Sequence, residues 1–242
     1  MRKALVTGGG SGIGAALVDL LIAEGYAVTA LDLTAWPGIT VADAADVPYD
    51  LFDLVFLNAG IIGQPGPAWA AGSDEVWRVN FHAPRRALQL LIPGWLAAEH
   101  KGRIVFTASM AALIPMPFST DYCASKAALL SLAETLLHEL RAAGSEIGVS
   151  VATPSFTQSN LANGLTGEIA EQFKRFNERG APAAEIARAI YDGALAGKFL
   201  IATHPNSLDT VLPHLEILLT GSEPPRPKGR RMDALFQTKY LG

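Results

Sequence analysis

Cysteine and long apolar runs are both scarce in this chain of 242 residues. With Cys123 as its single cysteine, the chain has neither an intrachain disulfide nor a cysteine metal site, which suits a reducing compartment. No apolar stretch reaches the roughly 18 residues that suggest a membrane span. The N-terminal apolar run ends at Gly8, too short for a signal peptide. We therefore expect a cytoplasmic protein.

Charge of one sign is not in excess either. The chain has 19 Lys and Arg against 23 Asp and Glu, a net charge of −4, which argues against nucleic-acid and anionic-membrane partners. Its five histidines lack ligand spacings such as H-E-x-x-H, so no metal site is expected. What is abundant is apolar side chains, 50% of the residues. We expect one domain over residues 1–242.

Apolar runs of strand length alternate with longer helical patterns. Strands are expected at 3–7, 27–32, 38–43, 54–58, 103–109, 148–154 and 198–203, and the main helices at 12–24, 73–100, 122–143 and 182–196. The strands are apolar on both faces, as in a parallel sheet covered on both sides. This alternation predicts a doubly wound α/β fold with about seven parallel strands and helices on both faces.

Three segments fall outside this alternation. The connection 33–42 is too short for a comfortable crossover helix, so we expect a loop or a single turn there. Residues 155–181 read as a loop-and-helix insertion after a strand end, where ligands of open α/β sheets bind, and are a candidate lid. The tail 221–242 should be irregular.

A glycine-rich turn, VTGGGSGIG, follows the first strand and opens the first helix. Gly8, Gly12 and Gly14 allow a tight turn and a close approach of the backbone to a pyrophosphate, and the helix N-terminus offers N–H groups to that anion. Asp32 ends the second strand, where a carboxylate accepts from the adenosine ribose hydroxyls. No Lys or Arg lies in the turn or in 33–42, so the charges favour NAD over NADP.

The ends of the next strands carry further candidates. Asp43, or alternatively Asp46, is placed to meet the adenine amino group. Asn58 begins the run NAG that ends the fourth expected strand; its amide can tie that strand to its neighbour, and Gly60 leaves room for a cofactor.

The run YCASK places Tyr122 and Lys126 on one helix face, four residues apart. A tyrosine has a pKa near 10, and a neighbouring ammonium favours its phenolate, which would bring it into range for general acid–base catalysis. Ser109, at the end of a strand, can hydrogen-bond the reacting oxygen from the other side.

Taken together, TGGGSGIG, Asp32, NAG, Asn80, Ser109 and YCASK resemble the short-chain dehydrogenase/reductase family, in order and spacing. The resemblance implies a Rossmann-type fold with Tyr122 as acid/base, Ser109 orienting the substrate, and Lys126 holding the nicotinamide ribose and lowering the pKa of Tyr122. Asn80 would anchor a water in a proton relay. Implied cofactor contacts are Gly8, Ser11, Gly12, Ile13, Gly14, Asp32, Asp43, Asn58, Ala59, Gly60, Tyr122, Lys126, Pro154, Thr157 and Ser159. The family also implies a homo-oligomer, a dimer or tetramer.

Two local features depart from a plain family pattern. Ser155 follows Pro154 where the family has glycine, so a side chain stands near the expected nicotinamide. Pro84 lies four residues after Asn80 in an expected helix and has no N–H to donate to the Asn80 carbonyl. We hypothesise that Pro84 keeps this carbonyl open for the relay water; a tolerated kink is the alternative.

The function favoured by the sequence is NAD(H)-dependent interconversion of a secondary alcohol and a ketone. Apolar residues near the expected pocket favour an apolar or aromatic substrate: Met110, Ile114, Met116, Phe118, Phe156 and Leu161. An epimerase or dehydratase reading is weaker, because such members carry an extended substrate domain. A non-catalytic NAD-sensing protein of the same fold is the alternative from another class, and such proteins commonly lack the tyrosine or lysine.

Overall fold

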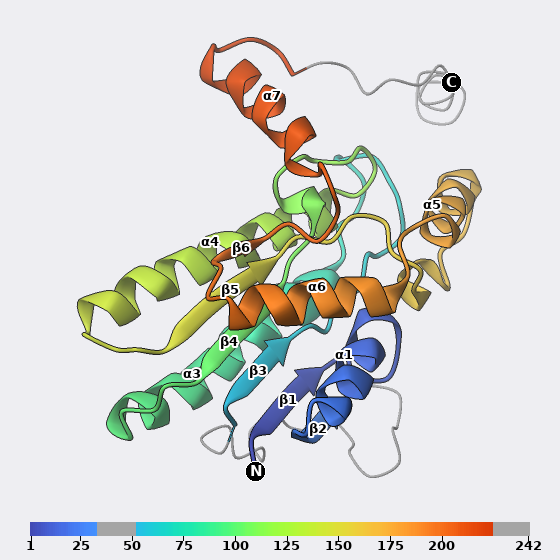
Figure 1. The fold of residues 1–242 in the computed structure, drawn as a ribbon. Helices are drawn as coiled ribbons and strands as arrows, with labels where there is room; N and C mark the ends of the chain where they lie inside the picture. Colours follow the sequence, from blue (N-terminus) through green and yellow to red (C-terminus); the bar gives the residue numbers. More distant parts are fainter. Residues whose placement is uncertain (33–51, 225–242) are drawn as a thin grey trace. The chain divides into compact units, whose positions relative to one another are not determined.

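The sheet of this computed structural model, which describes residues 1–32 and 52–224, has six parallel strands in the order β2-β1-β3-β4-β5-β6. These are β1 (Lys3–Thr7), β2 (Ala27–Leu31), β3 (Leu54–Leu57), β4 (Arg103–Thr107), β5 (Gly148–Ala152) and β6 (Leu200–Ile201). The doubly wound parallel fold is therefore confirmed (Figure 1). The strand expected at 38–43, with Asp43 and Asp46, lies outside the described residues.

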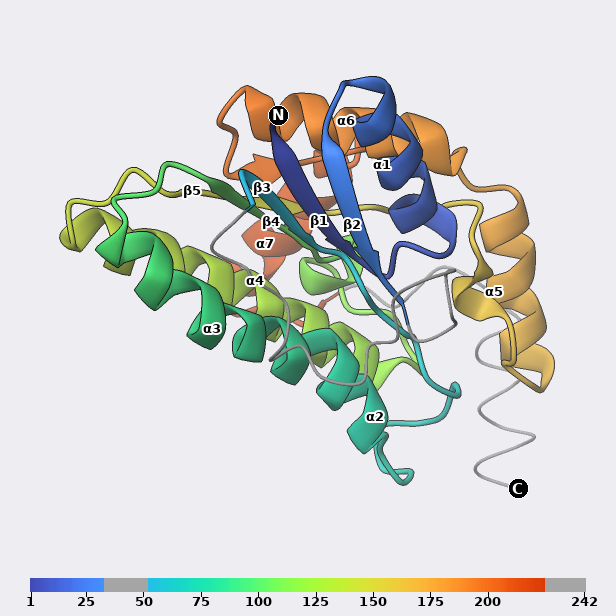
Figure 2. The same ribbon diagram turned by 90° about the horizontal axis from the view of Figure 1, so that it is seen from below.

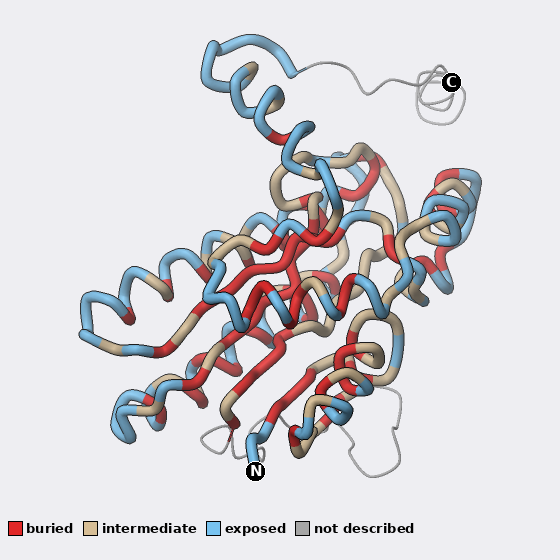
Figure 3. Tube along the Cα trace, viewed as in Figure 1, coloured by how far each residue is buried: buried red, intermediate tan, exposed pale blue. Residues whose placement is uncertain are grey.

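Helices cover both faces of this sheet (Figure 2). On one face, α1 (Gly12–Ala23) and α6 (Ala183–Leu195) share an apolar cluster with the strands; on the other, α3 (Ala83–Ala97) and α4 (Thr120–Ala142) do the same. The strands are correspondingly buried along their length (Figure 3). Burial on both faces explains why the strand sequences do not alternate.

The strand order reverses between β1 and β3. The chain runs from β1 outward to β2, then returns to pair β3 on the other side of β1. Such a switch point leaves a crevice at the carboxyl ends of the strands, where ligands of doubly wound sheets bind. Residues that follow β1, β3 and β4 therefore meet at one edge.

The helix expected at 73–100 is three segments in the structure. They are α2 (Asp74–Trp77), a π-helical turn (Arg78–His82) and α3. The N–H of Ala83 donates to the carbonyl of Arg78, five residues back, which is the π-type spacing. Asn80 lies within this turn, and Pro84 is the second residue after its end.

The remaining elements are short or lie late in the chain. Two 3-10 turns (Met110–Ala112 and Asn160–Ala162) and α5 (Glu168–Glu178) follow strands β4 and β5, the last two within the expected lid segment. The chain divides into two compact units, 1–207 and 208–242. The second unit holds α7 (Leu208–Leu219), a helix that the sequence analysis missed. Across residues 1–32 and 52–224, no helix is long and apolar enough to cross a membrane.

Candidate active site

The glycine turn lies at the switch point and is packed tightly. Gly8 has φ 69°, and a Cβ there would lie 2.8 Å from the Ala59 Cα. A Cβ on Gly14 would lie 1.9 Å from the Gly8 carbonyl oxygen, so helix α1 approaches the turn as only glycine allows. Ser11 precedes α1 without a side-chain cap bond, and Ile13 lies in the first turn, whose N–H groups have no intrahelical acceptor. The turn fits a pyrophosphate.

Asp32 follows β2 beside this turn. Its Oδ2 accepts a hydrogen bond of 2.7 Å from the N–H of Gly10. The carboxylate therefore stands at the carboxyl edge next to the glycine turn, where the sequence placed it for a ribose.

Thr7 and Asn58 join β1 to β3 at the same edge. The Asn58 amide donates to the Thr7 carbonyl at 3.1 Å, and the Thr7 hydroxyl accepts from the N–H groups of Asn58 and Ala59 at 2.9 and 3.1 Å. The predicted tie from Asn58 is confirmed. Thr7 was not predicted, because its partner lies about fifty residues away in sequence.

Ser109 and Tyr122 meet beside the end of β4. The Ser109 side chain lies close enough to the Tyr122 phenol to lower the pKa of that phenol. The Ser109 hydroxyl also accepts from the N–H of Ala111 at 3.1 Å and lies 3.4 Å from the carbonyl oxygen of Pro154. Tyr122 is only 6% exposed, in the first turn of α4. The two hydroxyls predicted to act on one substrate oxygen are thus adjacent.

Lys126 lies one turn further along α4, as predicted from YCASK. Its Nζ is 5.8 Å from the centre of the Tyr122 ring and donates to the Thr107 carbonyl at 2.8 Å. A Cβ on Gly60 would lie 3.0 Å from Nζ and 3.4 Å from the Asn80 Oδ1. The Lys126 and Asn80 side chains therefore both approach Gly60, where a larger residue would crowd them.

Asn80 is fully buried and anchored by its side chain. Its amide exchanges two 2.9 Å hydrogen bonds with the backbone of Ile61 and donates to the Ser125 hydroxyl at 3.0 Å. Ser125 in turn donates to the Tyr122 carbonyl at 2.9 Å. Ser125 links the π-helical turn to the helix of the tyrosine and was not predicted from the sequence. Bulges of π type occur frequently at functional sites.

The segment 154–159 runs between Ser109 and the glycine turn. The carbonyl of Pro154 accepts from the N–H of Met110 at 2.9 Å, and a Cβ on Gly12 would lie 2.9 Å from the Cβ of Ser159. Thr157, buried, hydrogen-bonds the Ser155 carbonyl at 3.0 Å. The predicted contacts after β5 are thus placed beside those after β1.

His204 clamps this segment from the strand β6 side. Its Nδ1 accepts from the N–H of Ser155 at 3.2 Å, and its Nε2 donates to the Phe156 carbonyl at 3.2 Å. This pair of bonds requires the neutral Nε2–H tautomer. His204 was not singled out from the sequence, because nothing near it signals a contact with residues almost fifty positions earlier.

The expected lid segment is hydrogen-bonded to the loop after β3. Gln64 donates to the Gly164 carbonyl at 2.9 Å and accepts from the N–H of Thr166 at 3.1 Å. Inside the lid, the rings of Phe156 and Phe176 stack at 5.0 Å. Phe156 therefore packs within the lid.

The surroundings of Tyr122 are apolar. Tyr122, Ala111 and Cys123 form a small cluster against which Ile62, Met116 and Leu161 pack. The Cys123 thiol is buried and bonded to the backbone of Met116, and burial raises its pKa. This agrees with the inert thiol that the sequence suggests.

Burial dominates the electrostatics of the site. It raises the pKa of Tyr122 to about 12, although the Ser109 side chain acts to lower it. Burial also lowers the pKa of Lys126 to about 8. The expected lowering of the Tyr122 pKa into working range is therefore wrong for the protein alone, because desolvation of the phenolate outweighs its local support. Within the described residues no group of three or more His, Cys, Asp or Glu side chains could hold a metal ion.

Comparison with known proteins places these features in context. The family model for short chain dehydrogenases matches residues 38–169, more than half of the chain. A 1-deoxy-11-beta-hydroxypentalenate dehydrogenase of Streptomyces exfoliatus is 31% identical over 196 residues, covering 68% of this chain and 70% of that protein.

Solved structures agree. A short chain dehydrogenase/reductase from Burkholderia phymatum in complex with NAD superposes with a TM-score of 0.83 at 26% identity, over 94% of this chain and 98% of that one. A short chain dehydrogenase from Burkholderia cenocepacia J2315 in complex with NADP gives 0.69 at 19% identity, over 91% and 97%.

The doubly wound fold and the residues at the carboxyl edge of its sheet are those of a nicotinamide-dependent oxidoreductase. Because the family model covers more than half of the sequence, the chain belongs to the short-chain dehydrogenase/reductase family. It is an enzyme that interconverts alcohols and carbonyl compounds with a nicotinamide dinucleotide.

Proposed function

We propose that the enzyme transfers hydride between NAD(H) and an apolar or aromatic secondary alcohol or its ketone. The observation that carries this proposal is the buried pair of Ser109 and Tyr122 next to Lys126, at the sheet edge that holds the glycine turn. A protein that only sensed the cofactor would have no use for this trio. Its apolar surroundings support a substrate without charge.

Tyr122, Ser109 and Lys126 have separate roles in proton transfer. In reduction, Tyr122 is protonated and donates to the developing alkoxide, while the Ser109 hydroxyl hydrogen-bonds the same oxygen. In oxidation, Tyr122 accepts the hydroxyl proton, and Lys126 favours the phenolate. When bound, the oxidised nicotinamide supplies the hydride acceptor and a positive charge. That charge would offset part of the desolvation that keeps the pKa of Tyr122 high.

Asn80 and Lys126 extend this path away from the substrate. Their side chains face the same space at Gly60, and the Asn80 side chain is fixed by Ile61 and Ser125. We propose that the Asn80 carbonyl holds the water through which Lys126 exchanges its proton. Cytoplasmic location and a homo-oligomeric state stay predictions.

NAD is the proposed cofactor because Asp32 places a carboxylate beside the glycine turn. A carboxylate accepts from a 2′-hydroxyl and repels a 2′-phosphate. One similar solved structure is in complex with NAD and another with NADP. The preference proposed here therefore rests on Asp32 and on the absence of Lys and Arg from the turn and from 33–42.

A panel of apolar secondary alcohols assayed with NAD and NADP side by side tests both statements. We expect NAD to be preferred in kcat/KM by at least about a hundredfold, and Asp32→Ser to reduce that preference by at least about tenfold, because the repulsion is removed. Asp19→Ser, on the exposed face of α1, is the control and should keep the preference. A wild type that prefers NADP would contradict the assignment.

A further inference from the structure

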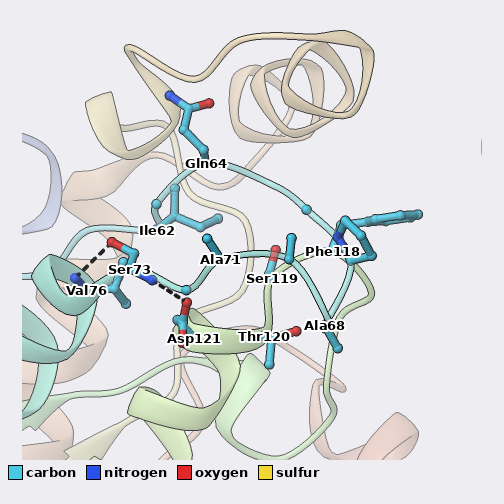
Figure 4. Close-up of a pocket in the computed structure, with 15 residues that line it drawn as sticks. Ile62, Gln64, Ala68, Ala71, Ser73, Val76, Phe118, Ser119, Thr120 and Asp121 are labelled. Atoms are coloured by element: carbon cyan, nitrogen blue, oxygen red, sulfur yellow. Dashed lines mark hydrogen bonds between the residues drawn. The ribbon is translucent and has the colours of Figure 1, made fainter. Parts of the chain in front are cut away.

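A pocket with a volume of about 70 Å³ lies beside the first turn of α4 (Figure 4). It is formed by the loop 62–73, by Val76 and by residues 118–121. Ile62 connects it to the site already described, because this side chain both lines the pocket and packs against the cluster of Tyr122. Ile62 is therefore a wall shared by the pocket and by the cluster that contains Tyr122.

Ser119 is the unusual group in this pocket. It precedes α4 as the N-cap residue, where serine normally accepts a hydrogen bond from the helix backbone, yet its side chain makes no cap bond. Ser119 is 6% exposed, and in the described part of the chain its hydroxyl has no hydrogen-bond partner. Buried hydroxyls are normally satisfied, because leaving one unpaired costs stability.

The backbone around Ser119 holds this hydroxyl at the pocket. Phe118 has φ 65°, a left-handed conformation that is unfavourable for a bulky residue, and its carbonyl accepts from the N–H of Gly66 at 3.0 Å. Figure 4 shows the Ser119 hydroxyl at the pocket, across from the loop that carries Ala71. The backbone conformation of Phe118 is thus held by a hydrogen bond between the two segments that line the pocket, 62–73 and 118–121.

The chemistry of the walls restricts the ligand. Asp121 lines the same pocket, with its carboxylate oxygens accepting from the N–H of Ser73 at 2.8 Å and from the Trp77 indole at 3.1 Å. A neighbouring carboxylate disfavours an anion. The small volume admits only one polar group with its carbon, and a serine hydroxyl serves as donor or acceptor. The matching ligand is a neutral hydroxyl or carbonyl oxygen.

We propose that Ser119 binds a second oxygen of the substrate. The substrate would then be a secondary alcohol or ketone that carries a further hydroxyl or carbonyl group, with Tyr122 at the reacting oxygen and Ser119 at the other. This inference rests on the proposed function, because it takes the first oxygen to be the one that Tyr122 serves. Ser119 determines specificity and takes no part in proton transfer.

The test compares cyclohexanol and 1-tetralol with their ring-hydroxylated derivatives, the second hydroxyl placed at successive positions, as NAD-dependent substrates. The wild type should prefer at least one diol over its parent alcohol by about tenfold or more in kcat/KM. Ser119→Ala should remove that preference and leave the parent alcohols unaffected. Ser131→Ala removes an exposed hydroxyl from the same helix and should keep the preference.

Thermal unfolding of the free protein supplies a second readout. Because the Ser119 hydroxyl makes no bond, Ser119→Ala should leave the Tm unchanged or raise it by about 2–4 °C. A drop in Tm would mean that the hydroxyl caps the helix, and overturns the proposal. A diol preference that persists in Ser119→Ala, or its absence from a wild type that oxidises the parent alcohols, also overturns it. Failure to turn over any alcohol with either cofactor contradicts the proposed function itself, and this inference falls with it.

Discussion

Two buried ionisable side chains, Tyr122 and Lys126, define the site at the scale of single residues. Each is held in the form that burial favours, the phenol neutral and the ammonium easily deprotonated. Burial thus raises the pKa of Tyr122 and lowers the pKa of Lys126. Neighbouring titratable groups whose pKa values are shifted in opposite directions are typical of acid–base sites. Burying these two ionisable groups therefore lowers the free energy of unfolding of the protein.

That cost is measurable at Lys126. Its pKa is about 8 in the folded chain and 10.5 as a free side chain, so the unfolded state holds more protons between those values. The free energy of unfolding contributed by this residue should therefore rise with pH in that window. Relative to Lys126→Met, we expect the wild type to gain on the order of 2 kcal/mol between pH 8 and 10.

Urea unfolding at intervals of pH checks this prediction. Lys198→Met, at an exposed position, is the control and should follow the wild type throughout the window. Parallel profiles for the wild type and Lys126→Met would show that Lys126 keeps its ordinary pKa in the folded protein.

The site residues that the sequence predicted are those that belong to short, recognisable motifs. Gly8, Gly14, Asp32 and the Tyr122–Lys126 pair were recognisable because short spacings fix their chemistry. Thr7, Ser125, Ser119 and His204 were not, because each acts through a partner or a wall that only folding brings near. An unpaired hydroxyl in particular has no signature in sequence.

At the scale of elements, the helical run from α2 to α3 carries the clearest irregularity. A π-type bond ends at Ala83, and Pro84 then supplies no N–H to the carbonyls of the preceding turn. An interruption of the helix at this position was predicted from Pro84 alone. The sequence could not predict a π turn, because the extra residue per turn depends on packing of Asn80 against Ile61 and Ser125.

Pro84→Ala tests whether this interruption serves the proton relay. An alanine restores an N–H that can occupy the Asn80 carbonyl, so we expect higher stability and a kcat lowered by about tenfold or more, with KM little changed. Pro93→Ala, in the same helix but farther from Asn80, should raise stability without lowering kcat. Unchanged kcat in Pro84→Ala would identify a merely tolerated kink.

His204 is the corresponding test for the segment after β5. His204→Phe removes the acceptor for the Ser155 N–H and the donor to the Phe156 carbonyl. Each bond contributes about 1 kcal/mol, so the Kd for NADH should rise by roughly tenfold if 154–159 holds the cofactor. Fluorescence titration of NADH measures this. An unchanged Kd would mean that the clamp does not support cofactor binding.

At the scale of the whole molecule, the succession of apolar strand-length runs and longer helical patterns predicted the parallel sheet and its two helical layers. The prediction succeeded because strands buried on both faces and long helical patterns are local signals repeated many times. Strand β6 is shorter than expected, pairing only through two residues at the edge. The helix α7 was missed, because Pro213 interrupts its pattern.

The leucines of α4 bear on the predicted homo-oligomer. From the sequence, Leu129, Leu132, Leu136 and Leu140 could serve either the core or a subunit interface. Leu129, Leu136 and Leu140 are buried in the chain's own core, and Leu132 is partly buried and packs against it. A subunit interface on α4 would therefore use side chains other than the three buried leucines, which a pattern of leucines could not reveal.

Direct hydride transfer assisted by Tyr122 is the central claim, and isotopic labelling tests it most directly. A secondary alcohol that the enzyme oxidises, deuterated at its carbinol carbon, is incubated with NAD, and the reduced cofactor is analysed by mass spectrometry. We predict that the deuterium is recovered in the reduced cofactor, and that Tyr122→Phe lowers turnover by at least about a hundredfold while still binding NADH. Deuterium lost to water, or turnover that survives in Tyr122→Phe, would contradict the account.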